Sequence, residues 1–187
     1  MVAFAEACLG TGEELFRIYV YDCPPYAQPA KHPVTGEMVD FGASRVAREQ
    51  GAFLDALARK DHVALRKGTL ILAGWKLKPS VQRTLIQNSR CLQSTDLIPD
   101  FKQKGVDIKI GLDVAWLSSK RIVDRVILVT GDSDFVPAMK FARREGVQVV
   151  LVTLGHRVIA SLIEHADEFR RVDWPTPQPA AVPPAGS

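Results

Sequence analysis

Two aspartates separated by a single residue, Asp132 and Asp134, follow directly after an apolar run in the sequence. The five β-compatible residues Val126–Thr130 are typical of a strand that is covered on both faces in a parallel sheet. Gly131 permits a tight turn at the carboxyl end of this strand, where open α/β sheets bind their ligands. Two carboxylates at that position could hold a divalent cation between them.

An ordinary structural role is the alternative for these two aspartates. Asp and Ser after a strand are common turn and helix-capping residues, so Asp134 could cap a helix predicted over residues 136–145. Pro137 fits the first turn of that helix, where a backbone N–H has no helical partner.

Two further carboxylates, Asp107 and Asp113, lie on a helix predicted over residues 106–120. Phosphodiester hydrolysis gains from carboxylates that hold Mg²⁺ or Mn²⁺, because the cation lowers the pKa of bound water and neutralises developing charge. Six residues on a regular helix place the two side chains about 240° apart, so we expect only one of them to face a common metal. A favourable negative charge near a helix N-terminus is the alternative for each.

The overall composition is that of a soluble protein in the reducing cytoplasm. The 187 residues are 47% hydrophobic and carry a net charge of +3, which suits one sizeable core and is compatible with nucleic acid. The three cysteines show no CxxC spacing and are interpreted as buried free thiols, and the four histidines lack zinc-ligand spacing. No apolar run reaches the length of a membrane span.

The strongest secondary-structure pattern is strand, helix, glycine and strand over residues 125–153. It predicts a βαβ unit with parallel strands, in which Gly146 ends the helix in a left-handed conformation. Before this unit we expect an interrupted helix at residues 2–15, a strand at 16–21 and an irregular segment at 26–42. An amphipathic helix at 44–60, a strand or hairpin at 63–77 and a weak helix at 81–90 are expected to follow. A last helix is expected over residues 157–166, before a flexible tail at residues 173–187 that carries five prolines.

These motifs resemble the NYN domain family. The matching segments are Lys104–Asp107, Gly111–Asp113, Val129–Phe135 and Ala142–Val147. More narrowly, they are similar to the LabA-like (DUF88) branch of the family, within the PIN-like nuclease superfamily. The resemblance implies an α/β fold with a parallel sheet in three layers, of PIN-like or Rossmann-like type, formed by residues 1–172 as a single domain.

The resemblance also implies a function, namely cleavage of RNA by a cluster of aspartates with Mg²⁺ or Mn²⁺. Asp132 and Asp134 would be metal ligands, and Asp107 or Asp113 would supply the carboxylate from the helix. Thr130 and Ser133 would orient a ligand or the attacking water. Lys104 would bind a substrate phosphate, although a solvated turn is the alternative for this lysine.

One element of the family pattern is missing from the sequence. NYN and PIN-like domains begin with a strand that ends in an aspartate, and residues 1–17 contain no such motif. Two explanations are open: Met1 is an internal methionine of a longer chain, or this member has lost the strand.

Two functions therefore compete. The first is a metal-dependent ribonuclease, impaired if the first aspartate is absent. The second is a catalytically degenerate NYN module that binds RNA or a protein partner, and a homo-oligomer is also open. A phosphatase of the haloacid dehalogenase type is disfavoured, because the D-x-D-x-[TV] motif that it needs does not follow an early strand.

Overall fold

The computed structural model describes residues 1–88, 90–154 and 158–174, and the chain forms two compact units. One unit comprises residues 17–112, and the other comprises residues 1–16 with the chain from Asp113 onward. Most of the tail predicted over residues 173–187 lies outside the described residues, as does the start of the helix predicted over 157–166. None of the helices in the described part of the chain is long and apolar enough to cross a bilayer.

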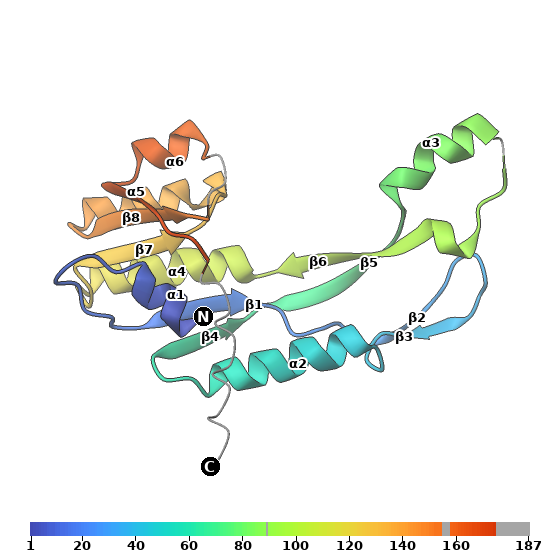
Figure 1. The fold of residues 1–187 in the computed structure, drawn as a ribbon, viewed down its shortest axis with the longest axis horizontal. Coiled ribbons are helices and arrows are strands. Elements are labelled where there is room, and N and C mark those ends of the chain that lie inside the picture. The colour runs from blue at the N-terminus through green and yellow to red at the C-terminus, as the bar shows by residue number, and fades with distance from the viewer. Residues whose placement is uncertain (89, 155–157, 175–187) are drawn as a thin grey trace, which may run out of the picture. The chain divides into compact units, whose positions relative to one another are not determined.

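The unit that contains Asp132 is built on a parallel sheet. Its strands lie in the order β7–β8–β9 (Figure 1), and its helices include α1 at the N-terminus and α5 and α6 between the strands. The elements are α1 (Val2–Ala7), β7 (Arg125–Val129), η2 (Ser133–Phe135), α5 (Val136–Arg144), β8 (Gln148–Thr153), α6 (Ala160–Glu164) and β9 (Glu168–Arg171).

Strand β8 is the centre of this unit because both of its faces are covered. Val149–Val152 are fully buried. Side chains alternate between the faces of a strand; Val150 and Val152 pack with Phe4 and Cys8 on one face, while α5 also packs against β8. Helix, sheet and helix thus form the expected α/β layers.

The predicted βαβ unit is confirmed. β7 and β8 pair in parallel, with Arg125 opposite Gln148 and Val129 opposite Val152. α5 ends at Arg144, and Gly146 has a φ of 84°, the left-handed conformation expected after a helix C-terminus. The edge strand β9 was not predicted from the sequence. Its parallel pairing with β8 and the 2.6 Å ion pair of Arg170 with Glu13 hold it in place.

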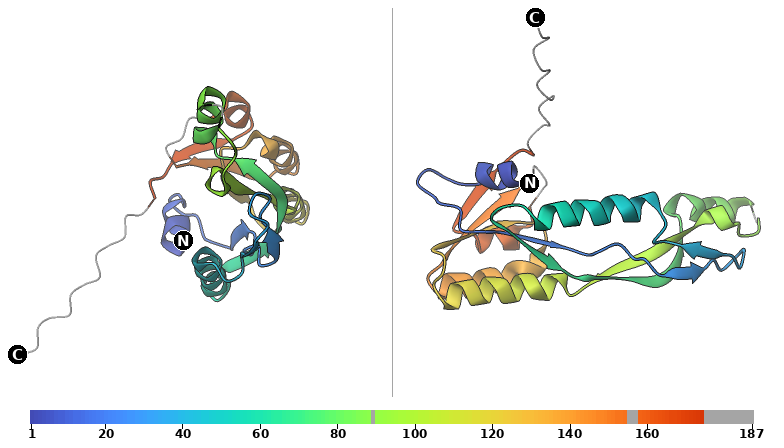
Figure 2. Two further views of the ribbon diagram at one scale, coloured as in Figure 1. Left: turned by 90° about the vertical axis from the view of Figure 1, so that its right-hand side faces the viewer. Right: turned by 90° about the horizontal axis from the view of Figure 1, so that it is seen from below.

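The second unit combines a parallel pair of strands with a long antiparallel ribbon (Figure 2). β1 and β4 are parallel, and α2 lies between them in the chain and packs on β4. The elements are β1 (Ile18–Asp22), β2 (Pro29–Lys31), β3 (Met38–Asp40), α2 (Arg45–Ala58), β4 (Val63–Lys67), β5 (Thr69–Leu77), α3 (Pro79–Asn88), η1 (Ser94–Asp96) and β6 (Leu97–Lys104). Helix α4 (Val106–Ser119) continues from this unit into the other.

Two expectations for this unit are wrong. The segment 26–42 is not irregular throughout, since β2 and β3 form a short hairpin within it. For the segment 63–77 only the hairpin alternative is wrong: the segment forms two strands, but β4 pairs with β1 and β5 pairs with β6. Gly68 separates the two strands. The residues on either side of it, Lys67 and Thr69, pair with different strands, β1 and β6.

The cysteines differ from one another in exposure. Cys8 and Cys23 are buried, and burial raises the pKa of both thiols. Cys91 is exposed, so the expectation of three buried thiols is wrong for this residue.

Candidate functional site

The candidate carboxylates Asp132 and Asp134 lie in a turn at the carboxyl end of β7. The strand ends at Val129, and η2 and then α5 follow the turn without interruption. Phe135, of which only 8% is exposed, anchors the turn beneath these two exposed aspartates. The structure therefore confirms the expected position of both residues in the chain, in a turn at the carboxyl end of a parallel strand.

Asp132 has a structural role within this turn. It is the N-cap of η2, and its Oδ1 accepts a hydrogen bond of 2.9 Å from the backbone N–H of Asp134. Its own backbone N–H donates to Oγ1 of Thr130 at 3.0 Å. The expectation that Asp134 caps α5 is wrong, because Phe135 occupies the N-cap of that helix. Capping falls to Asp132, since a 3₁₀ turn precedes α5.

Asp134 and Ser133 present their side chains without a structural role of this kind. Within the described residues, the structure records no hydrogen bond or ion pair of the Asp134 carboxylate or the Ser133 hydroxyl. The carboxylate oxygens of Asp134 and Oδ2 of Asp132 could coordinate a hard cation, because such cations prefer oxygen ligands. Gly131 does not have a positive φ, and a Cβ there would meet nothing within 4 Å, so the turn itself does not require glycine.

The two aspartates of α4 lie at different depths along the helix. Asp107 is exposed in the first turn, and Asp113 is half-buried six residues later. Asp113 belongs to the same unit as Asp132, whereas Asp107 belongs to the other unit. Over residues 1–88, 90–154 and 158–174, no three His, Cys, Asp or Glu side chains form a group that could hold a metal ion.

Lys104, the candidate phosphate ligand, is exposed at the last position of β6. Gly105 follows with a φ of 77° and turns the chain into α4. The sequence did not predict β6. For this reason it did not show that the pairing of β5 with β6 brings Lys76 and Asp100 onto the same ribbon as Lys104. Residues Phe101–Lys104 do not alternate between apolar and polar types, so the sequence carries no period-two signal for this end of the strand.

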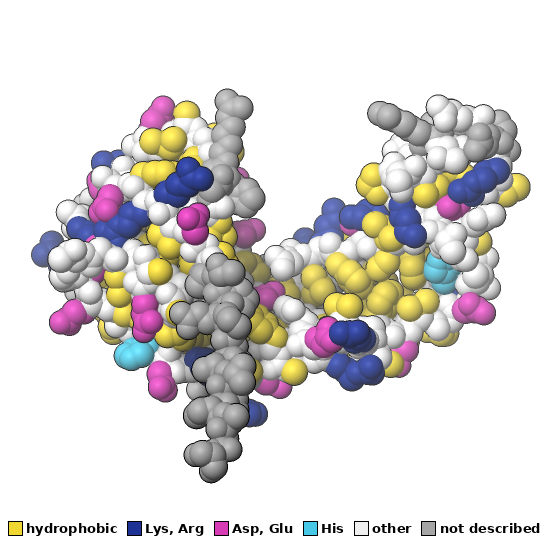
Figure 3. Space-filling view, in the orientation of Figure 1, with side chains coloured by type: hydrophobic (Ala, Val, Ile, Leu, Met, Phe, Trp, Pro, Cys, Tyr) yellow, Lys and Arg dark blue, Asp and Glu magenta, His cyan; other side chains and the backbone are white. Residues whose placement is uncertain are grey.

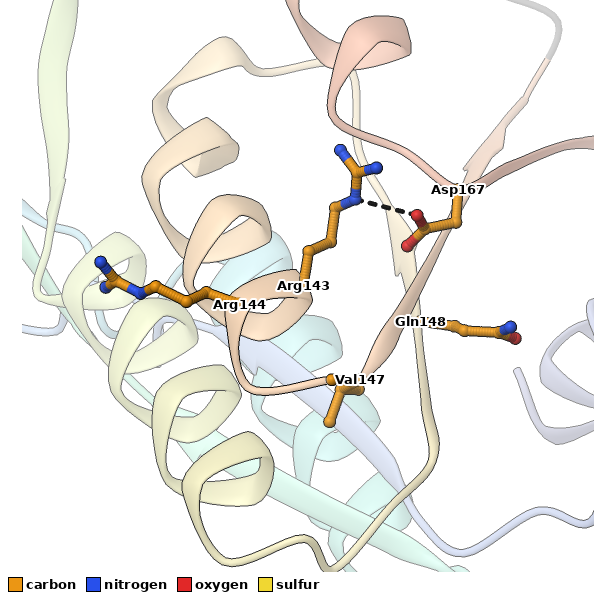
Figure 4. A pocket seen from close by; sticks show the side chains of 6 residues that line it. Arg143, Arg144, Val147, Gln148 and Asp167 are labelled. Atoms are coloured by element: carbon orange, nitrogen blue, oxygen red, sulfur yellow. Dashed lines mark hydrogen bonds and ion pairs between the residues drawn. The ribbon is translucent and has the colours of Figure 1, made fainter.

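A depression in the same unit as Asp132 lies at the amino end of β8 (Figure 4). It has a volume of about 460 Å³ and is lined by Arg143, Arg144, Gly146, Val147, Gln148 and Asp167. Arg143 forms a 2.9 Å ion pair with Asp167, whose other oxygen accepts a hydrogen bond from the N–H of Val149. Arg143 is thus a structural residue at the amino end of β8, remote from the carboxyl end of β7.

Comparison with known proteins identifies the family. The sequence model of the NYN domain matches residues 49–173, which include all seven candidate site residues. Among curated proteins, none matches the chain. A solved structure of a protein of unknown function from Vibrio parahaemolyticus is 24% identical; the alignment covers 65% of this chain and 76% of that one, with a TM-score of 0.35. The NYN match spans more than half of the chain, so the chain belongs to the NYN domain family, whose fold is PIN-like.

Proposed function

We propose that this protein is a metal-dependent ribonuclease of the LabA-like branch, in which Asp132 and Asp134 hold Mg²⁺ or Mn²⁺. NYN membership supports a nuclease-like function related to RNA. The observation that carries the proposal is the pair of exposed carboxylates at the carboxyl end of β7. Mg²⁺ is commonly bound by one or two protein carboxylates, with water and substrate phosphate completing its coordination, so two aspartates are a sufficient protein contribution.

Each residue of the turn has a distinct part in this proposal. When bound, the cation would lower the pKa of a water molecule and neutralise charge on the phosphate. Asp132 would coordinate the cation through Oδ2, because its Oδ1 accepts a hydrogen bond from the backbone N–H of Asp134. Oγ1 of Thr130 accepts a hydrogen bond from the backbone N–H of Asp132 and so positions this residue. The hydroxyl of Ser133 orients the attacking water or a phosphate oxygen.

The remaining candidates extend this site in the proposal. Asp113 supplies the carboxylate from α4, with Asp107 as the alternative, and Lys104 binds a phosphate of the RNA. We further propose that residues 1–172 act as a single NYN domain, because the family match crosses from one compact unit into the other. A cytoplasmic location fits a protein that acts on RNA.

The test is RNA cleavage with Mg²⁺ or Mn²⁺ by the wild type and by Asp132→Asn. We expect cleavage to require the cation and to fall at least about 100-fold in the variant, because a metal ligand has been lost. Asp61→Asn is the matched control, since Asp61 is exposed and lies in a turn of the other unit. Equal cleavage by Asp132→Asn and the wild type would reject the site.

A degenerate module that binds RNA or a protein partner, alone or as a homo-oligomer, is the second candidate function. It is favoured by the hydrogen bond that already occupies Oδ1 of Asp132, and by the lack of a third converging carboxylate among the described residues. RNA binding by the wild type without any cleavage in Mg²⁺ or Mn²⁺ would distinguish this function from the first.

A further inference from the structure

The β5–β6 ribbon has two faces of different chemistry. Residues that are directly opposite on antiparallel strands point to the same face. Leu72 is opposite Phe101, and Trp75 is opposite Pro99, which makes one face apolar. Ile71 is opposite Lys102, on the other face. We call this second face the basic face; it comprises Thr69, Ile71, Lys76, Ile98, Asp100, Lys102 and Lys104.

The apolar face is occupied by packing within its own unit. Phe41 contacts Phe101 edge-on, with ring centroids 5.3 Å apart, and lies 6.0 Å from the ring of Trp75. Tyr26 lies 5.6 Å from the ring of Phe101. Along Thr69–Leu72 the residues alternate between exposed and half-buried, in the phase that leaves the basic face in solvent. The aromatic cluster therefore fixes which side of the ribbon is presented.

The basic face carries three lysines and one carboxylate. Asp100 forms a 2.7 Å ion pair with Lys76 and lies 3.9 Å from the ammonium group of Lys102. No ion pair of Lys104 is recorded within the part of the chain that the structure describes. The face thus has an excess of positive charge, which Asp100 reduces. Figure 3 shows Lys and Arg side chains gathered along β5 and β6 beside an apolar surface.

We propose that the basic face binds the phosphate backbone of single-stranded RNA without reading its sequence. Lys102 and Lys104 are two residues apart on one strand, about 7 Å, which resembles the separation of neighbouring phosphates in an extended strand. Lys76 lies opposite Ile98, so the lysines extend over about 20 Å of the ribbon. Lysines act as point charges for phosphate, whereas base reading requires groups that form paired hydrogen bonds.

This inference extends the proposed RNA substrate to a surface outside the aspartate turn, and it is tested without cleavage. The affinity for a fluorescent ten-nucleotide RNA is measured in EDTA over a series of salt concentrations. We expect Lys76→Ala/Lys102→Ala, which spares Lys104, to weaken binding about 10- to 100-fold at low salt and to reduce the salt slope by about 1.4, which corresponds to two lost phosphate contacts. The control is Lys31→Ala/Lys60→Ala, which removes the same charge at two exposed lysines of the same unit.

A second variant changes the affinity in the opposite direction. Asp100→Asn releases Lys76 and Lys102 from their shared carboxylate, so we expect RNA binding to tighten about 2- to 5-fold. Asp61→Asn also removes one negative charge, but in an exposed turn away from the basic face, and should leave the affinity unchanged. Circular dichroism of each variant confirms the fold.

The outcomes separate this inference from the proposed function. Weaker binding by the lysine pair with unchanged control variants supports the inference, whether or not the wild type cleaves RNA. Equal losses in the two lysine pairs, absence of RNA binding by the wild type, or displacement of the RNA by polyglutamate at equal charge concentration would each overturn it. The last result would point to an acidic polypeptide as the partner.

Discussion

The Oδ1 atom of Asp132 accepts a 2.9 Å hydrogen bond from the backbone N–H of Asp134. The carboxylate that caps the turn is therefore also the one proposed to bind a metal. Both roles are compatible, because a carboxylate has two oxygens and the cap uses one of them. The hydrogen bond holds the Asp132 carboxylate against the backbone of Asp134 before any cation binds, which reduces the conformational entropy that binding must remove.

Thr130 is expected to position Asp132 rather than to contact RNA. Thr130→Val has nearly the same shape but cannot accept the 3.0 Å hydrogen bond from the N–H of Asp132. We expect this variant to lose about 0.5–1.5 kcal/mol of stability and to cleave RNA several-fold more slowly. Thr130→Ser keeps the acceptor and should retain most of the activity. Cleavage rates at saturating Mg²⁺, together with urea unfolding, check this, and full activity of Thr130→Val would contradict it.

Gly68 is expected to be irreplaceable for steric reasons. A Cβ at this position would lie 2.7 Å from Cγ2 of Val106, 2.8 Å from Sγ of Cys23 and 2.9 Å from the carbonyl oxygen of Lys104. Gly68→Ala should lower the free energy of unfolding by about 1–3 kcal/mol, because a backbone atom cannot move away as a flexible side chain can.

A matched glycine gives the opposite expectation. Gly51 lies within α2, and a Cβ there would meet nothing within 4 Å. Gly51→Ala should raise the unfolding free energy by about 0.5–1 kcal/mol, since alanine favours the helix. Urea unfolding midpoints of both variants provide the measurement. A loss of stability in both, or in neither, would show that the contacts around Gly68 are not as described.

The Arg90–Asp96 pair predicts a specific dependence of stability on pH. Two hydrogen bonds from the Arg90 guanidinium, with one from the N–H of Gln93, lower the pKa of the buried Asp96 to about 2. A lowered pKa in the folded state stabilises the fold above the unfolded pKa, about 4, and this contribution disappears as the pH falls towards 2.

The comparison of wild type with Asp96→Asn isolates this effect. We expect the wild type to be more stable from pH 7 to pH 5, with a difference that shrinks between pH 4 and pH 2. Urea unfolding at each pH measures it. A difference that stays constant down to pH 2 would mean that Asp96 does not titrate as the ion pair requires.

The local pattern of the sequence was sufficient for the βαβ unit. The apolar residues of β7 and β8, with Gly146 between α5 and β8, predict parallel strands without reference to the rest of the chain. The amphipathic helix expected over residues 44–60 is found as α2, and the structure shows Ser44 as its N-cap. Leu54 and Leu57 of this helix are buried, whereas Val46 is 74% exposed.

Elements that depend on distant partners were not predicted. β6 contains Pro99 and three polar residues at its end, and only its pairing with β5 makes it a strand. β9 is rich in charge and is held by β8 and by the ion pair of Arg170 with Glu13. Both interactions connect residues far apart in the sequence, which local patterns cannot reveal.

The candidate site was predicted in its location but not in its internal contacts. The end of an apolar strand placed Asp132 and Asp134 at the sheet edge. Which of them caps the following turn depends on the 3₁₀ geometry of η2; the sequence offered capping by Asp134 only as an alternative to metal binding, and that alternative is wrong. The charge balance of the basic face depends on the pairing of β5 with β6, so the contact of Asp100 with Lys76 was not foreseen.

The most direct test of the proposed function is a Mn²⁺ titration followed by NMR of the backbone amides. Binding at Asp132 and Asp134 predicts that the amides of residues 131–135 broaden first, at Mn²⁺ concentrations below that of the protein, and that Asp132→Asn and Asp134→Asn each abolish this broadening. The control Asp61→Asn should leave it unchanged. Broadening that begins elsewhere, or that persists in both aspartate variants, would contradict a metal site in this turn.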